Sequence, residues 1–168
     1  DPGLKFERSA SVPAVAGSYT TSKGELLSFP FNSSTTVFYY NKDAFAKAGI
    51  DKVPTTWPEV PAAAGKLKAS GFGCAYTTAW PSWIHMESFS AWHNVPFATH
   101  NNGFGGPKAR LAIDTPLHER HLASLAQWAE DGWFQYAGRG AEGDSKFASG
   151  ECAMGTASSA AYANIKRN

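Results

Sequence analysis

The chain has no long run of apolar residues, few charged residues, and only two cysteines among its 168 residues. A membrane-spanning helix needs about 20 consecutive apolar residues. No stretch of the sequence approaches that length, so the sequence predicts no such helix. Charged residues make up 17% of the chain and the net charge is +1, without a basic block. The sequence therefore does not predict a nucleic-acid partner. Its hydrophobic fraction of 43% is typical of a globular domain.

Motifs that carry catalysis or hold a cofactor are also missing. The sequence contains no GxSxG, no GxxxxGK[ST] and no HExxH motif, and no pair of carboxylates stands out. The glycine-rich segment 101–106 does not join a strand to a helix, so it indicates a surface turn. The segment 118–121 has two histidines three residues apart but no third ligand. We interpret it as a solvent-exposed helix face, and we predict no catalytic residue, metal site or cofactor.

The two cysteines, Cys74 and Cys152, lie far apart in the sequence and form no CxxC motif. They are compatible with one disulfide in an oxidising compartment. They are equally compatible with two buried thiols, so the sequence leaves the bond open.

Periodicity and capping residues predict an alternation of strands and helices. The expected strands are 37–40, 73–78 and 151–156, and the expected helices are 41–49, 56–70, one from 82 onward, 115–132, 144–147 and 160–166. Such alternation is typical of an α/β fold, in which helices flank a sheet. The first 28 residues are instead rich in Gly, Pro, Ser and Thr, and the last helix has only about two turns. Both ends indicate a piece of a longer protein.

Small polar or aromatic residues flank three of the expected strands, in segments 32–36, 77–80 and 156–159. In open α/β sheets, ligands bind at strand ends and at helix N-termini. These segments therefore predict a site for a small ligand that has an anionic end and a hydroxylated, partly apolar body.

Four sequence segments extend this interpretation. They are LLSFPFNSSTTVFYYNKDAFAKAGI, CAYTTAWPSWIHMESFSAW, NNGF and CAMGTASSAAYANI, in this order. Together they resemble the middle of family 1 extracellular solute-binding proteins of ABC importers, from about Ser11 to Ile165. The resemblance implies a two-lobed α/β clamp like the type II periplasmic binding proteins, of which this chain is a fragment. Residues 1–31 would belong to the first lobe and linker, 32–41 to the interlobe hinge strand, and 42–168 to an incomplete second lobe.

The resemblance is greatest to members that capture sn-glycerol-3-phosphate or related glycerophosphodiesters. It implies a periplasmic or lipid-anchored extracellular binding component that delivers this ligand to membrane permease subunits, without enzymatic activity. One alternative is a sugar- or oligosaccharide-binding protein of the same fold. A less favoured alternative is an enzyme acting on glycerophosphodiesters, for which the sequence shows no nucleophile or metal site.

The resemblance also implies three ligand-binding residues, Ser34, Trp80 and Ser158. Ser34 would contact the ligand, Trp80 would pack on the glycerol, and Ser158 would hold the phosphate. We further expect free backbone N–H groups and a helix dipole after Ser158 to favour the phosphate. Trp80 and Ser158 would then lie at the far ends of the strands that begin at Cys74 and Cys152. These two strands should therefore run parallel, with both cysteines at the same end.

Overall fold

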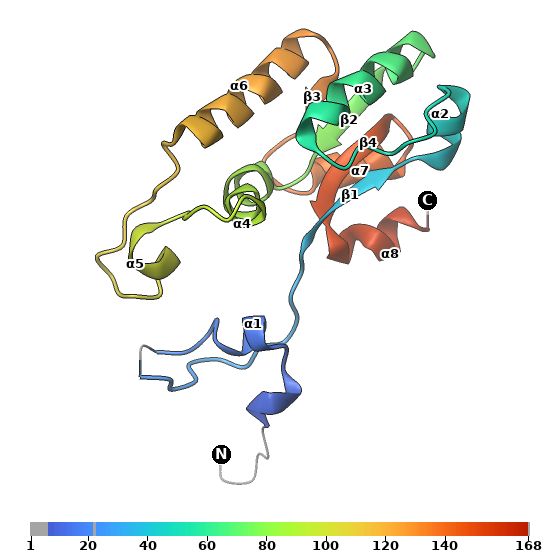
Figure 1. Ribbon diagram of the computed structural model, residues 1–168. Coiled ribbons are helices and arrows are strands. Elements are labelled where there is room, and N and C mark those ends of the chain that lie inside the picture. The colour runs from blue at the N-terminus through green and yellow to red at the C-terminus, as the bar shows by residue number, and fades with distance from the viewer. Residues whose placement is uncertain (1–6, 22, 168) are drawn as a thin grey trace.

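The computed structural model describes residues 7–21 and 23–167, and it contains a mixed four-stranded sheet with helices on both faces (Figure 1). The strands are β1 (Thr36–Tyr40), β2 (Cys74–Thr78), β3 (Phe134–Tyr136) and β4 (Cys152–Ser158). The α-helices are α1 (Pro13–Ala16), α2 (Lys42–Lys47), α3 (Val60–Ala69), α4 (Phe89–Trp92), α5 (Thr99–Asn102), α6 (Pro116–Glu130), α7 (Glu142–Ala148) and α8 (Tyr162–Ile165). Short 3-10 turns are η1 (Arg8–Ala10), η2 (Trp57–Glu59) and η4 (Ser159–Ala161), and η3 (Trp83–Ser88) is π-helical. The predicted α/β class is confirmed.

The strand order is β1-β4-β2-β3, and β2 runs parallel to both β4 and β3. Strand β1 is antiparallel to β4, with Thr36 opposite Ser158. The carboxyl ends of β2, β3 and β4 therefore lie beside the amino end of β1. We call this end of the sheet, marked by Thr36, Thr78, Tyr136 and Ser158, the carboxyl edge.

Cys74 and Cys152 lie at the opposite end of the sheet and are joined by a disulfide. They are directly paired in the parallel register of β2 and β4, with their Cα atoms 4.5 Å apart. The predicted parallel arrangement, with both cysteines at one end, is confirmed. The question that the sequence left open is answered by the bond itself.

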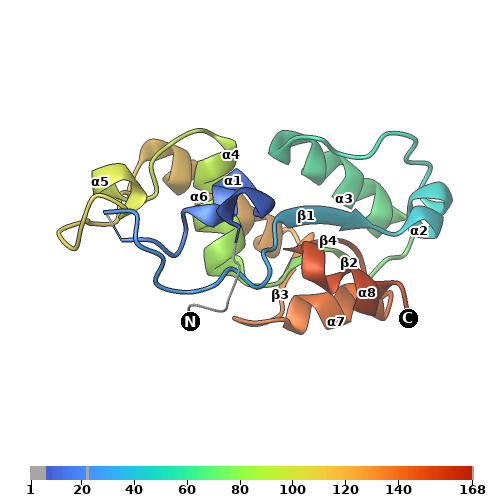
Figure 2. The ribbon, with the colours of Figure 1, turned by 90° about the horizontal axis from the view of Figure 1, so that it is seen from below.

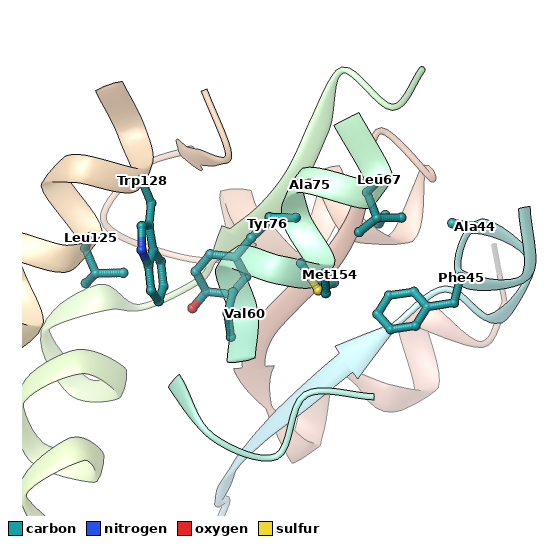
Figure 3. Close-up of a cluster of buried hydrophobic side chains, with 12 residues drawn as sticks. Ala44, Phe45, Val60, Leu67, Ala75, Tyr76, Leu125, Trp128 and Met154 are labelled. Carbon is teal, nitrogen blue, oxygen red and sulfur yellow. The ribbon is translucent and has the colours of Figure 1, made fainter. Parts of the chain in front are cut away.

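One face of the sheet carries the main core, which packs under α2, α3 and α6 (Figure 3). Tyr76 of β2 and Met154 of β4 are fully buried there, against Leu67 of α3 and Trp128 of α6. Burying each large apolar side chain contributes about 1.5–3 kcal/mol. Helices α7 and α8 cover the other face, as the view from below also shows (Figure 2).

Helix starts on the core side follow from local capping. The Asn41 side-chain oxygen accepts a hydrogen bond from the Ala44 N–H at 3.0 Å, which begins α2 as expected. Before α3, the Glu59 carboxylate accepts from the N–H groups of Thr55 and Thr56 at 2.7 and 3.1 Å. These bonds use backbone donors that a helix start leaves unpaired.

Helix α6 corrects one interpretation of the sequence. His118 and His121 are only 1% and 6% exposed, so the two histidines of the segment 118–121 do not lie on a solvent-exposed face. They share a buried stripe with Leu125 and Trp128, since steps of three and four residues return to one side of a helix. Leu122 of the same helix is exposed.

The described residues before β1 form an arm that extends away from the sheet (Figure 1). This arm contains η1, α1 and a single bridge between Thr20 and Leu26. Within residues 7–21 and 23–35, it adds no strand to the four-stranded sheet. The division of the chain into a first lobe, a hinge strand and a second lobe stays a prediction.

Candidate functional site

Ser34, Trp80 and Ser158 all lie at or beside the carboxyl edge. Ser158 ends β4, and Ser34 lies two residues before Thr36, its partner on β1. Trp80 follows β2 by two residues, and the Ala79 N–H donates to the Thr156 carbonyl at 3.0 Å. The sheet thus brings together three segments that lie far apart in the sequence.

Two backbone segments are joined directly beside Ser158. The Ser159 N–H donates to the Thr35 carbonyl at 2.8 Å, and the Thr35 N–H donates to the Ser159 hydroxyl at 3.2 Å. The Ser158 hydroxyl accepts from the Ala160 N–H at 3.0 Å as the N-cap of η4. Because this bond uses an oxygen lone pair, the hydroxyl proton of Ser158 can be donated to a ligand.

These same bonds correct the expected row of free N–H groups after Ser158. The N–H groups of Ser159 and Ala160 are both already paired within the protein. The helix that follows is also short, since η4 and α8 together end at Ile165. Binding of a phosphate beside Ser158 would therefore depend on side chains more than on backbone N–H groups at the helix start.

Trp80 is half-exposed, at 46%, and is therefore not a core residue. Its backbone has a positive φ of 45°, an uncommon conformation for a residue other than glycine. The Trp80 N–H donates to the Gly140 carbonyl at 2.8 Å, which joins the end of β2 to the loop after β3. The ring lines a cavity of about 600 Å³, together with Pro81, Ser82, Tyr136, Arg139 and Gly140.

The loop after β3 is packed tightly against the end of β2. The Gly140 N–H donates to the Glu142 carboxylate at 2.7 Å. Gly143 lies so close to β2 that a Cβ atom there would be 2.2 Å from the Thr78 carbonyl oxygen. Tyr136 and Arg139 were not predicted from the sequence, because no motif or periodic pattern marks this short strand and its loop.

A second cavity, of about 610 Å³, opens between η2, α4 and α6. Ser34, Trp80 and Ser158 do not line it. Its lining includes the aromatic residues Phe38, Trp57, Phe89 and Trp92, together with Arg120 and His121.

A buried network of histidines and hydroxyls lies beside this second cavity. His85 Nδ1 and His121 Nε2 are 3.0 Å apart, and the Tyr76 hydroxyl lies 2.7 Å from the Thr156 hydroxyl. Burial, with a smaller contribution from His121, lowers the pKa of His85 to about 3. Burial, with smaller contributions from His93 and His118, lowers the pKa of His121 to about 4. His85 and His121 are therefore neutral near pH 7 and offer an anion no positive charge.

Groups of His, Cys, Asp and Glu that could hold a metal ion are not found among the described residues. In the same part of the chain, no helix combines the length and the apolar character needed to cross a membrane.

Comparison with known proteins identifies the family. A family model described as bacterial extracellular solute-binding protein matches residues 2–168. The chain belongs to this family. Its relatives are binding proteins and not enzymes, and their names are consistent with a periplasmic or extracellular location.

Two curated relatives share a high sequence identity with the chain. The chain is 50% identical over 169 residues to the sn-glycerol-3-phosphate-binding periplasmic protein UgpB of Escherichia coli strain K12. It is also 50% identical over 170 residues to the protein of that name from Salmonella typhimurium. Both matches cover 99% of this chain and 39% of the relative, so the chain spans about two fifths of their length.

Solved structures agree on the fold. UgpB of Mycobacterium tuberculosis, crystallised with glycerophosphocholine, matches with a TM-score of 0.74 at 21% identity. That match covers 96% of this chain and 41% of the other. A structure described as a probable secreted solute-binding lipoprotein of Streptomyces coelicolor matches with a TM-score of 0.65 at 22% identity, over 94% of this chain and 40% of the other. The arrangement is consistent with a fragment of a two-lobed binding protein.

Proposed function

We propose that this chain is the central part of a binding protein that captures sn-glycerol-3-phosphate and delivers it to the permease of an ABC importer. The observation that carries the proposal is the 50% identity to UgpB over 99% of the chain. In this proposal residues 1–31 belong to the first lobe and linker, residues 32–41 form the hinge strand, and residues 42–168 form most of the second lobe.

The geometry of the carboxyl edge supports this ligand. The half-exposed ring of Trp80 offers a flat apolar surface that suits the carbon atoms of glycerol. The hydroxyls of Ser34 and Ser158 can donate hydrogen bonds to phosphate oxygens. Serine hydroxyls can also bind the hydroxyls of a neutral sugar. The preference for a phosphate ester over a sugar therefore rests on the 50% identity to the sn-glycerol-3-phosphate-binding protein UgpB.

Isothermal titration calorimetry on the full-length protein tests the proposal. Trp80→Ala and Ser158→Ala should each weaken binding of sn-glycerol-3-phosphate at least about tenfold, or about 1.4 kcal/mol. Trp92→Ala is a matched control, because Trp92 is exposed to a similar extent, 48% against 46%, but lines the second cavity. That variant should bind like the native protein.

Two results would contradict the proposal. One is unchanged affinity in both Trp80→Ala and Ser158→Ala, and the other is tighter binding of maltose than of sn-glycerol-3-phosphate. Incubation with glycerophosphocholine addresses the enzyme alternative. A binding protein leaves this compound intact, whereas an esterase would release choline.

A further inference from the structure

We propose that Arg139 is the positive charge that this chain contributes to the ligand site, and that it binds the anionic group of the ligand. The inference rests on the proposed function and names a residue for it. Arg139 lies in the loop after β3, a strand that the sequence did not predict.

Apart from Arg139, the carboxyl edge has few groups that could bind an anion. The N–H groups of Ser159 and Ala160 are already paired, so they are not free donors. Ser34 and Ser158 offer hydroxyls but no charge. A phosphate is bound most strongly by a guanidinium, whose planar donors match its oxygens in pairs.

The second step is the position of Arg139. It lines the same cavity as Trp80, and the bond between the Trp80 N–H and the Gly140 carbonyl fixes its loop beside that residue. In the strand order, β4, β2 and β3 are neighbours, and Ser158, Trp80 and Arg139 lie at or beyond their carboxyl ends. Neighbouring strands are about 4.8 Å apart, so β4 and β3 are separated by about 10 Å. A small phosphate ester together with an arginine side chain can span this distance.

The third step is that Arg139 is exposed and has no acidic partner within the described structure. Only two ion pairs are found among residues 7–21 and 23–167, Lys52 with Glu59 and Lys146 with Glu151. The acid nearest in sequence, Glu142, instead accepts the Gly140 N–H at 2.7 Å. The guanidinium is therefore available to a ligand.

The fourth step is that the loop is already fixed before a ligand arrives. Glu142 folds back on Gly138 and Gly140, where added Cβ atoms would lie 2.6 and 3.3 Å from its carboxyl group. Gly143 packs directly on the Thr78 carbonyl. Because these contacts hold the loop backbone, little of its conformational entropy is lost when a ligand binds, which favours affinity.

The test uses Arg139→Gln, Arg139→Lys and the matched control Arg120→Gln in the full-length protein. Arg120 is also exposed, but it lines the second cavity. Calorimetry with sn-glycerol-3-phosphate should show at least about tenfold weaker binding for Arg139→Gln and a smaller loss for Arg139→Lys. Arg120→Gln should bind like the native protein. Affinity should also fall less steeply with added salt in Arg139→Gln than in the native protein, because a screened charge pair has been removed.

An equal affinity and salt dependence in Arg139→Gln and the native protein would overturn the inference. So would a loss confined to Arg120→Gln, which would assign the anion to the second cavity. If Arg139 has a purely structural role, Arg139→Gln should unfold at a lower temperature, and the salt dependence of its binding affinity should be unchanged. If the native protein does not bind sn-glycerol-3-phosphate, the proposed function fails as well. If Trp80→Ala weakens binding and Arg139→Gln does not, only the role of Arg139 fails.

Discussion

Reduction of the Cys74–Cys152 disulfide should cause a large loss of stability. The bond joins residues separated by 78 positions, and chain-entropy theory assigns about 4.5 kcal/mol to closing a loop of this length. Both cysteines are buried at the amino ends of neighbouring parallel strands. Reduction removes this cross-link and mainly increases the conformational freedom of the unfolded chain.

Urea unfolding of the full-length protein, followed by tryptophan fluorescence with and without reductant, measures this effect. We expect the reduced protein to lose about 3–5 kcal/mol, within the range typical of native disulfides. The double variant Cys74→Ala/Cys152→Ala is the control. Its stability should be low in both conditions and insensitive to reductant.

A difference below about 1 kcal/mol between the oxidised and reduced native protein would refute the reasoning. Loop closure would then not be the main contribution of this bond. A reductant effect of similar size in the double variant would show that the reductant acts elsewhere.

Two further predictions concern a close contact and the buried histidines. Gly143→Ala should destabilise the protein by about 1–3 kcal/mol in urea unfolding, because its new Cβ would meet the Thr78 carbonyl oxygen at 2.2 Å. Gly65→Ala, in open space on α3, should instead stabilise it by about 0.5–1 kcal/mol, and equal effects of the two changes would contradict this account. In the folded protein the pKa of His85 is about 3 and that of His121 is about 4, whereas a histidine in the unfolded chain has a pKa of about 6.5. As the pH falls below 6.5, the unfolded chain therefore binds protons before the folded protein does. The urea midpoint should therefore fall as the pH drops from 6.5 towards 3, and less steeply in His85→Gln/His121→Gln. An equally steep fall in that variant would exclude these rings as the cause.

Elements governed by local interactions were predictable from the sequence. The helix expected over 41–49 is α2, which Asn41 caps and Gly49 follows with a positive φ of 62°, typical of a glycine just after a helix end. The strand ending at Thr78 was predicted to within a residue. These features depend on side chains within a few positions of one another, so a single sequence contains their cause.

Features that depend on distant partners were not predictable. Strand β3 has only three residues, Phe134–Tyr136, too few to show a periodic pattern, and its pairing with β2 defines it. His118 appeared typical of a solvated face because Ser90, 28 residues away in the sequence, could not be placed beside its ring. Arg139 was missed for the same reason, since its importance depends on the loop that meets Trp80. The three proposed ligand residues came from family resemblance, and their contacts with a ligand stay a prediction.

The disulfide and the proposed ligand residues lie at opposite ends of the sheet. Cys152 and Ser158 stand at the two ends of β4, about 20 Å apart at the usual rise of a strand. Mutations around Trp80 and the loop after β3 therefore leave the cross-linked end untouched. Specificity can diverge at the carboxyl edge while the covalent anchor at the other end keeps the sheet folded. For protein engineering, the exposed residues Trp80 and Arg139 beside the edge can be varied, whereas buried Thr78 and tightly packed Gly143 must be kept.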